Sequence, residues 1–430
     1  MTSPLVLPDS LAAWLVYIES QHPKSIAMGL ERVQQVRSRL QLDFSFLLIT
    51  VGGTNGKGST CAMLERIYCE AGYRVGCYSS PHFLRYNERV RVSGMEADDA
   101  ALCAAFTAVE QARGSTPLTY FEFGTLAAAW HFVQSGLDVL VMEVGLGGRL
   151  DAVNLFDPDC AVVTGIDLDH MDYLGDSRES IGFEKAGIFR SGIPAICGDR
   201  QPPASLIAHA RGLGAELQCL GLDFEHQQRH LHWAWMQGDK VLDGLSQPAL
   251  TGDFQHDNAA CVVAVTQALQ ARLPLSVADI NAGLQHVQLA GRYQQVGQRP
   301  LRILDVAHNP QAARALADNL QRQVVNGRTL AVFAMLQDKD IGAVVDAVSA
   351  HIDVWCIAGI ALPRGASAAF LADTIARHQP DAVLHVSANV TQAYASACQQ
   401  AAENDRIIVF GSFFTVADVM RVLVHDQTTG

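Results

Sequence analysis

The chain has 430 residues, of which 49% are apolar and 17% are charged, so it can bury enough apolar surface to form two domains with separate cores. Its 31 Lys and Arg residues against 44 Asp and Glu residues give a formal charge of -13, which argues against a general nucleic-acid or membrane-surface binder. An anionic small ligand is still compatible with this balance, because the field of distant charges is screened beyond about 8 Å at physiological salt.

Cysteine usage and hydropathy indicate a cytoplasmic protein. The ten cysteines are scattered singly with no C-x-x-C spacing, which is typical of a protein whose thiols stay reduced. The N-terminus has no basic start and no signal-peptide pattern, and no apolar run approaches the length of a membrane span. We therefore expect neither a membrane nor a nucleic-acid partner.

Strands and helices alternate along the first part of the chain, which predicts a parallel sheet with right-handed crossovers. The predicted helices are 11–18, 30–40, 59–71, 97–111, 123–134 and 256–270, and the predicted strands are 46–51, 74–79, 138–144, 160–166 and 193–197. Residues 230–244 alternate in polarity around a Gly-Asp turn, which predicts a hairpin.

A glycine-rich loop, GTNGKGST at residues 53–60, follows the first predicted strand and opens a helix. Glycines let backbone N–H groups crowd an anion, Lys57 can reach the outer phosphates, and Ser59 or Thr60 can bind Mg²⁺. A glycine-rich turn without a ligand is the alternative. Gly-Lys-Gly-Ser directly after a strand favours phosphate binding.

The alternation of strands and helices begins again after a segment rich in Gly and Gln. Strands are predicted at 301–306, 330–335, 354–357, 382–386 and 407–410, with helices between them. The predicted fold class is therefore α/β, with an N-terminal P-loop doubly wound domain and a smaller C-terminal Rossmann-like α/β domain. We expect the first domain at 1–288, a hinge at 289–300 and the second domain at 301–430.

Polar side chains follow several predicted strands at their carboxyl ends, where open parallel sheets bind their ligands. Hard oxygen ligands and one imidazole at neighbouring strand ends suit Mg²⁺ held beside ATP phosphates. Each residue alone is more often a cap or a turn residue, but their shared position beside the phosphate loop favours a metal site. In the first domain they are Ser80, Glu143, Asp167, Asp169 and His170, and Asp305 and His308 follow a predicted strand of the second domain in the same way.

The loop T-N-G-K-G-S resembles the ATP loop of the Mur ligase superfamily, and most closely that of its folate branch, the dihydrofolate and folylpolyglutamate synthases. A P-loop of the form G-x4-G-K-[ST] would instead need Gly at position 51 and Ser or Thr at position 58, where this chain has Val51 and Gly58. The resemblance extends to S-P-H at 80–82, T-Y-F-E-F at 119–123, E-V-G-L-G-G-R-L-D-A-V-N at 143–154, D-L-D-H at 167–170, E-K-A-G-I at 184–188 and L-D-V-A-H-N-P at 304–310.

The resemblance implies the residues that bind ATP and metal. Nucleotide contacts are implied for Thr54, Asn55, Gly56, Lys57, Gly58, Ser59, Thr60, Gln255, Asn258, Arg292 and Asp305, with Gln255 and Asn258 on the adenine side. Metal ligands are implied at Ser59, Ser80, Glu143, His170 and Lys185, where carbamylation would turn the lysine into an anionic ligand. The implied catalytic residues are Lys57, Lys185 and His308. Without the family context, Lys185 reads as an ordinary surface lysine near Glu184, and Arg292 and Asp305 read as hinge and capping residues.

A pterin and folate site is implied by the same resemblance. Its residues are Ser25, Ile26, Ala27, Met28, Thr119, Tyr120, Phe121, Glu122, Leu150, Asp151 and Ala152. The chain departs from the family at Ala27, where an Asp is usual, so one carboxylate that could bond the pterin ring is missing.

The implied activity is that of an ATP-dependent amide ligase. It would add L-glutamate to dihydropteroate, giving dihydrofolate, and to reduced folates, giving polyglutamates, through an acyl phosphate. ATP, two Mg²⁺ ions and a monovalent cation are the expected cofactors, and the protein is expected to be a monomer. The alternatives are a monofunctional folylpolyglutamate synthase, another Mur-type amide ligase, and a non-catalytic nucleotide-binding protein.

Overall fold

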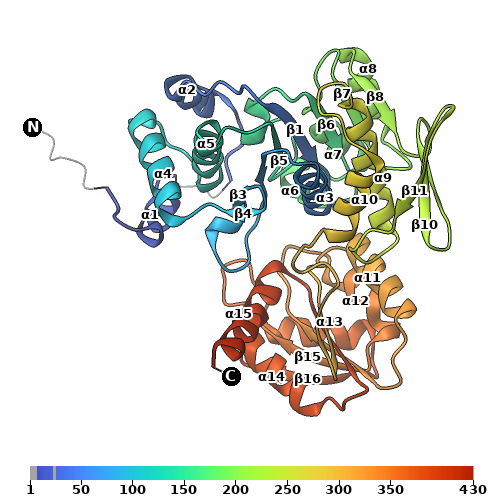
Figure 1. The fold of residues 1–430 in the computed structure, drawn as a ribbon. Coiled ribbons are helices and arrows are strands. Elements are labelled where there is room, and N and C mark those ends of the chain that lie inside the picture. Colours follow the sequence, from blue (N-terminus) through green and yellow to red (C-terminus); the bar gives the residue numbers. More distant parts are fainter. Residues whose placement is uncertain (1–6, 23–25, 430) are drawn as a thin grey trace, which may run out of the picture. The chain divides into compact units, whose positions relative to one another are not determined.

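The structure is a computed structural model, and it describes residues 7–22 and 26–429 (Figure 1). The chain divides into two compact units. The first consists of Met1–Ala249 and His256–Val287, and the second of Leu250–Gln255 and Gln288–Gly430. Each unit is an α/β structure built on its own largely parallel sheet, which confirms the predicted fold class.

The first unit contains an eight-stranded sheet in the order β4-β3-β2-β5-β1-β6-β7-β8. Its central strand β1 (Leu47–Gly52) pairs in parallel with β5 (Val139–Glu143) on one side and with β6 (Cys160–Val163) on the other. The chain first leaves β1 towards β2 and later returns to its other side, so the carboxyl end of β1 is a topological switch point, where such sheets bind ligands. The remaining strands are β2 (Val75–Tyr78), β3 (Val90–Val92), β4 (Met95–Glu96), β7 (Pro194–Cys197) and β8 (Glu216–Cys219).

Helices cover both faces of this sheet because its strands are apolar on both sides. Within β1, Leu48 packs into the core on one face of the sheet, and the neighbouring Ile49 and Val51 are buried on the opposite face, because side chains alternate along a strand. A first group of helices packs on the face that Leu48 occupies. The first group is α1 (Leu11–Glu19), α2 (Glu31–Leu40), α4 (Asp99–Arg113), α5 (Tyr120–Val133), α7 (Arg178–Ala186) and α8 (Ala204–Leu213). Figure 1 shows the second group, α3 (Lys57–Glu70), α9 (Phe254–Ala268) and α10 (Val277–His286), on the other face.

A separate three-stranded antiparallel sheet precedes α9 in the first unit. It consists of β9 (Glu225–Gln228), β10 (His232–Gln237) and β11 (Lys240–Ser246), in the order β11-β10-β9. The hairpin predicted at 230–244 corresponds to β10 and β11, and the sequence analysis did not predict β9 as their third strand.

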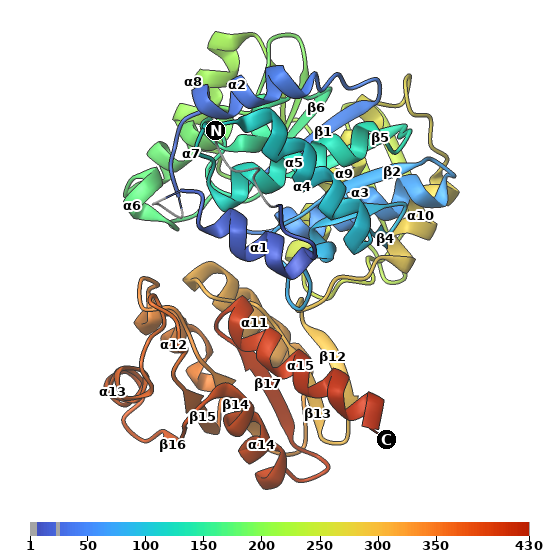
Figure 2. The ribbon, with the colours of Figure 1, turned by 90° about the vertical axis from the view of Figure 1, so that its left-hand side faces the viewer.

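The second unit contains a six-stranded sheet in the order β12-β13-β17-β14-β15-β16 (Figure 2). Its strands are β12 (Gln294–Gln298), β13 (Leu301–Leu304), β14 (Thr329–Phe333), β15 (Val354–Ala358), β16 (Val383–Ser387) and β17 (Arg406–Phe410). Helices α11 (Pro310–Arg322), α12 (Ile341–Val348) and α13 (Ala368–His378) share one buried core with this sheet. Helices α14 (Val390–Gln400) and α15 (Phe413–Thr429) pack on strands β14, β15 and β17.

Part of the segment expected to be a hinge, 289–300, is a strand in the structure. Residues Gln294–Gln298 form the edge strand β12, which pairs antiparallel with β13. Gly and Gln are weak strand formers, so the composition suggested a loop, whereas the backbone hydrogen bonds to β13 determine the conformation. The residues 250–255, placed in the first domain from the sequence, belong to the second compact unit.

No helix within residues 7–22 and 26–429 is both long enough and apolar enough to cross a membrane. All ten cysteines are free thiols.

Candidate functional site

The phosphate loop lies between β1 and α3, and its backbone depends on two glycines. Gly53 has φ +143° and Gly56, the N-cap of α3, has φ +89°, conformations that other residues rarely adopt. The Lys57 Nζ donates to the carbonyl oxygens of Gly53 (2.9 Å) and Thr54 (3.2 Å), so the loop wraps around its own lysine. The arrangement places the positive end of α3 and an ammonium group beside the loop, as an anion site requires.

Further loop residues occupy the first turn of α3. Gly58 is half-buried, and Ser59 and Thr60 are fully buried. The Oγ1 of Thr60 has no hydrogen-bond partner among the described residues. A buried hydroxyl of this kind at a helix N-terminus is compatible with the expected nucleotide and metal.

The phosphate loop is bonded directly to the residues that follow strand β6 and to the D-L-D-H segment after them. The Thr164 Oγ1 donates to the Asn55 carbonyl oxygen (2.6 Å), and the Thr54 N donates to the Gly165 carbonyl oxygen (2.7 Å). The Asp167 N donates to the Thr54 Oγ1 (3.1 Å). The segment expected to supply His170 therefore begins in contact with the loop expected to hold ATP. Nothing in the sequence pattern indicated Thr164 as the link.

Two of the expected metal ligands are in direct contact. Glu143 ends β5, beside Val51 at the end of β1, and its Oε2 accepts a hydrogen bond from the Ser80 N (3.1 Å). Ser80 follows β2 and His170 follows β6, so the expected ligands lie at the ends of strands that neighbour one another in the sheet. His170 has a left-handed backbone, φ +52°, and its N donates to the Asp169 Oδ1 (2.8 Å).

The hydroxyl and carboxylate groups among these donors match the preference of a hard divalent cation for oxygen ligands, and His170 adds one imidazole. Within the described parts of the chain, no group of three or more His, Cys, Asp or Glu side chains has the arrangement of a metal centre. To reach a full set of metal ligands, the expected site would therefore need its serine hydroxyls and a modified Lys185 in addition to Glu143 and His170.

Lys185 lies on α7 and is buried, with 3% of its surface exposed. Burial, and secondly the charge of Lys57, lowers the pKa of its amine to about 7. The neighbouring Glu184 is paired instead with Arg149, at 2.7 Å from Nη2 to Oε1. The alternative that Lys185 is an ordinary surface lysine is therefore wrong, because packing of α7 buries its side chain beside the phosphate loop lysine.

The structure brings together two segments of the expected pterin site that lie about ninety residues apart in the chain. Thr119 caps α5, and Glu122 accepts a hydrogen bond from the Thr119 N (2.8 Å). Arg32 forms an ion pair with Glu122 and donates from Nη2 to the Ala27 carbonyl oxygen (2.5 Å). Arg32 was not among the expected site residues. Ile26 and Met28 flank Ala27 and are half-buried, and Ser25 lies outside the described residues.

The aromatic residues of the same site pack on two other segments of the chain. The ring of Tyr120 lies 5.9 Å from that of Tyr86, and the Arg89 Cζ lies 5.7 Å from the Tyr120 ring centroid. Phe121 packs so closely on Gly145 that a Cβ on that glycine would lie 2.5 Å from the Phe121 ring. The T-Y-F-E-F segment is thereby joined to the segment 143–154.

Asp151 is the buried carboxylate of that second segment. It accepts hydrogen bonds from the backbone N of Leu146 (2.9 Å) and Val153 (3.0 Å), and burial raises its pKa to about 7. Its neighbours Leu150 and Ala152 are half-buried and buried, respectively. A carboxyl group with this pKa can serve a ligand as either donor or acceptor near neutral pH.

Replacing Asp151 with Asn is expected to flatten the pH dependence of stability between about pH 4 and pH 7. Over that window the folded protein keeps a proton that the unfolded chain, with the ordinary pKa of 3.8, has released. The free energy of unfolding of the wild type therefore falls as the pH rises, and the full penalty is present above about pH 7. Denaturant unfolding of both proteins from pH 4.5 to 8 measures this, and a stability difference that stays constant with pH would contradict it.

In the second unit, the expected residues Arg292 and His308 both lie near Phe413, and the charge of Arg292 acts on the expected residue Asp305. The Arg292 Cζ lies 5.3 Å from the Phe413 ring centroid, and the His308 ring lies 6.3 Å from it. The Asp305 carboxylate accepts from the backbone N of Tyr293 and of Ala307, both at 2.8 Å, and burial raises its pKa. Phe413 was not among the expected site residues.

Asn258 and Gln255 occupy the first turn of α9, and both are buried. Asn258 lies against the phosphate loop, since a Cβ added to Gly56 would come within 2.5 Å of the Asn258 Oδ1. The structure thus places one of the two expected adenine contacts beside the loop expected to hold the phosphates.

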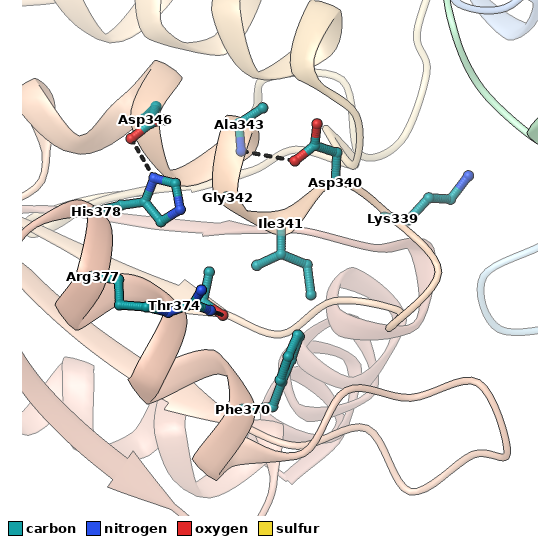
Figure 3. A pocket seen from close by; sticks show the side chains of 10 residues that line it. All are labelled: Lys339, Asp340, Ile341, Gly342, Ala343, Asp346, Phe370, Thr374, Arg377 and His378. Carbon is teal, nitrogen blue, oxygen red and sulfur yellow. Dashed lines mark hydrogen bonds and ion pairs between the residues drawn. The ribbon is translucent and has the colours of Figure 1, made fainter. Parts of the chain in front are cut away.

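A cavity of about 460 Å³ in the second unit contains none of the expected site residues (Figure 3). Several of its lining groups are hydrogen-bonded to other residues of the same unit. Asp340 accepts from the Ala343 N (3.0 Å), and His378 bonds to Asp346 (2.8 Å). Arg377 donates to the Thr374 Oγ1 (3.0 Å).

Known families and proteins match nearly the whole chain. The Mur ligase middle domain matches residues 51–266, and the Mur ligase glutamate ligase domain matches residues 291–413. The dihydrofolate synthase/folylpolyglutamate synthase of Escherichia coli strain K12 is 45% identical over 421 residues, which cover 98% of this chain and 97% of the relative. The protein of the same name from Haemophilus influenzae is 39% identical over 434 residues, which cover 96% and 97%.

Solved structures agree with this assignment. E. coli FolC in complex with DHPP and ADP has a TM-score of 0.92 and 45% identity, covering 97% of this chain and 99% of that chain. A bifunctional folylpolyglutamate synthase/dihydrofolate synthase with Mn, AMPPNP and L-glutamate bound has a TM-score of 0.89 and 47% identity, covering 97% and 98%. The resemblance expected from the sequence is confirmed, and the chain belongs to the Mur ligase family, within it to the dihydrofolate synthase/folylpolyglutamate synthases.

Proposed function

We propose that this chain is an ATP-dependent ligase that joins L-glutamate to dihydropteroate, giving dihydrofolate, and to reduced folates, giving folylpolyglutamates. The observation that carries the proposal is the phosphate loop bonded to the D-L-D-H segment, with Ser80, Glu143 and the buried Lys185 close by. Support also comes from relatives that bear both activities in their name at 45% and 39% identity over almost the full chain.

The reaction needs activation because a carboxylate resists attack by an amine. A carboxylate oxygen of the folate substrate attacks the terminal phosphorus of ATP, a P–O bond forms, and ADP leaves. The amine of L-glutamate then attacks the acyl carbon, the tetrahedral intermediate expels phosphate, and the amine loses its proton. No covalent enzyme nucleophile takes part, so the free cysteines need not react.

Charge stabilisation is the main task of the protein in such a transfer. Lys57 and the N–H groups at the start of α3 would offset the charge on the transferred phosphoryl group, with Arg292 as a further cation. His308 is the proposed base; its Nδ1 lies 2.7 Å from the Val306 carbonyl oxygen and donates to it, so in the neutral imidazole the unprotonated nitrogen is Nε2.

Two Mg²⁺ ions and a monovalent cation complete the proposed cofactors. Ser59, Ser80, Glu143 and His170 would hold one Mg²⁺, and Lys185, as a carbamate, would hold the second. When bound, these ions neutralise phosphate charge beside ATP. Relatives with ADP, or with Mn and AMPPNP, support a nucleotide and a divalent metal. We further propose a cytoplasmic monomer whose partners are dihydropteroate, reduced folates and L-glutamate, with no nucleic acid and no membrane.

Dihydropteroate is the substrate that Ala27 affects most. A carboxylate usual in the family is absent there, and a monofunctional folylpolyglutamate synthase is therefore the second candidate. The backbone of Ala27 is nevertheless held by Arg32, and Asp151 provides a buried carboxyl group in the same expected site, which favours bifunctionality.

Phosphate release from ATP is expected with L-glutamate and either dihydropteroate or tetrahydrofolate. The two acceptors are assayed separately, each with a control that lacks glutamate, so that uncoupled ATP hydrolysis is subtracted. Release with tetrahydrofolate alone would establish the monofunctional enzyme. Release with neither acceptor would contradict the proposal and favour another Mur-type amide ligase or a non-catalytic nucleotide-binding protein.

A further inference from the structure

The three-stranded sheet β9–β11 is attached to the first turn of α9 by two sets of polar contacts. The first is an ion-pair network around Arg200, which follows β7. Arg200 donates to both oxygens of Glu225 on β9, at 2.7 and 2.8 Å, and to the Asp257 Oδ1 on α9, at 2.9 and 3.1 Å. The His226 Nε2 lies 2.9 Å from the same Asp257 oxygen. The bidentate pair lowers the pKa of Glu225, chiefly through the hydrogen bond from Arg200.

The second set of contacts holds the residue before Asp257. The Gln228 Nε2 on β9 donates to the His256 Nδ1 (2.9 Å), and the His256 Nε2 donates to the Gln247 Oε1 (2.5 Å). Trp233 of β10 is fully buried, and its ring lies edge-on to those of His226 and His256, at 6.1 and 6.2 Å. The side chain of His256 is therefore fixed by hydrogen bonds on both nitrogens and by an aromatic contact.

The contacts to the small sheet and the expected adenine residues lie on different sides of the same turn of α9. Residues 255 and 258 are three apart and share one side of α9, whereas 256 and 257 point to other directions around the helix. The same turn thus carries the expected adenine residues on one side and the attachments to the small sheet on the other. Asn258 also lies against Gly56 of the phosphate loop, so rotation or displacement of this turn would change its place relative to the phosphates.

We infer that the sheet β9–β11 and Arg200 form a brace that fixes the first turn of α9 and so orients Gln255 and Asn258 towards the adenine of ATP. Arg200, Glu225, Gln228 and Asp257 are positioning residues, since they act through the helix and not on the nucleotide. The inference rests on the proposed function, in which Gln255 and Asn258 contact adenine.

Arg200→Gln tests the brace through base recognition and not through overall stability. The variant is expected to bind ATP about tenfold more weakly in calorimetry, because it removes charged hydrogen bonds that hold the turn. Its affinity for inorganic tripolyphosphate, which has no base, is expected to remain unchanged. The preference for ATP over GTP is expected to fall for the same reason. Gln228→Leu, which leaves the ion pairs intact, is expected to change the ATP affinity in the same direction.

Arg229→Gln is the matched control. Arg229 pairs with Asp243 at 2.8 Å in the same small sheet, and its exposure of 44% is close to the 43% of Arg200, but the pair has no part in the contacts to α9. This variant is expected to bind ATP and tripolyphosphate as the wild type does.

Two results would overturn the inference. ATP binding within twofold of the wild type in both Arg200→Gln and Gln228→Leu would show that the turn needs no brace, as would an equal loss for ATP and tripolyphosphate. Asn258→Ala distinguishes a failure of the brace from a failure of the adenine assignment. If Asn258→Ala lowers the affinity for ATP but not for tripolyphosphate, and Arg200→Gln changes neither affinity, only the brace is contradicted. If Asn258→Ala changes neither affinity, the assignment of Asn258 to adenine is contradicted, and with it the role of the brace.

Discussion

Lys185→Ala is expected to lose at least about 10²-fold in turnover while still binding ATP. Lys185 is buried, and burial lowers the pKa of its amine to about 7, so the amine loses its proton near neutral pH. A neutral amine can form a carbamate: its nitrogen bonds to the carbon of CO₂ and releases a proton. The product is an anionic oxygen ligand placed beside the phosphate loop. Alanine offers no such ligand, whereas Lys57 and the loop N–H groups that hold the phosphates stay in place.

Three measurements separate the carbamate from a merely structural lysine. Native mass spectrometry of the wild type is expected to show the added mass of one CO₂, and calorimetry is expected to show similar ATP affinity in both proteins. A short carboxylate such as formate is expected to restore part of the turnover of the variant by occupying the vacated ligand position. Lys240→Ala, an exposed lysine on β11, is the control and should keep full turnover. A fully active Lys185→Ala variant would remove the carbamate from the mechanism.

Most parallel strands of both sheets could be predicted because each is a short apolar run followed by a turn signal, whereas β3, β4, β8 and β12 were not predicted. The strand predicted at 138–144 is β5 (Val139–Glu143), and the strand at 354–357 is β15 (Val354–Ala358). A run of this kind, buried on both faces, is the sequence signature of a parallel sheet. Its ends were accurate to within a few residues because the flanking residues are polar.

Helices α7, α8 and α10 are among those that were not predicted, and the composition of α7 explains why in its case. Its residues Arg178–Ala186 read RESIGFEKA, with polar residues nearly throughout and a glycine at its centre, so the apolar stripe is weak. Ser177 does provide an N-cap, and its capping box with Ser180 is a signal that could have located the start of α7. The helix matters because it carries Lys185 into the interior.

The candidate site was predictable as a set of motifs but not as a set of contacts. The loop at 53–60 and the carboxylate Glu143 could be read from local sequence, since strand ends in a parallel sheet meet at one edge. The links between motifs could not. Arg32 joins Ala27 to Glu122 across about ninety residues, and an arginine in an amphipathic helix carries no signal of such a partner. The burial of Lys185 likewise follows from tertiary packing alone.

Gly53→Ala is expected to weaken ATP binding by about 10²-fold or more, since strain of a few kcal/mol would fall on the loop that holds the phosphates. At φ +143°, Gly53 has a backbone that an alanine rarely adopts. A Cβ would also lie 1.8 Å from the Thr164 Oγ1 and 3.0 Å from the Thr164 Cβ. Thr164 cannot retreat easily, because its Oγ1 donates to the Asn55 carbonyl oxygen and its N donates to the Gly52 carbonyl oxygen (2.9 Å). The loop must therefore move away from β6, and its N–H groups would no longer converge on one anion.

Gly72→Ala separates this clash from the cost of a positive φ. Gly72 lies just beyond the end of the same helix α3, with φ +86°, and a Cβ there would meet no atom within 4 Å. Calorimetric ATP affinity and the thermal unfolding midpoint are compared for both variants: Gly72→Ala should lose some stability but keep its affinity, whereas Gly53→Ala should lose affinity. The double variant Gly53→Ala/Thr164→Ala removes the closest contact but not the strained backbone, so only part of the affinity should return. Wild-type ATP affinity in Gly53→Ala would mean that the phosphate loop tolerates a side chain at its tightest point, and that its contact with β6 does not shape the nucleotide site.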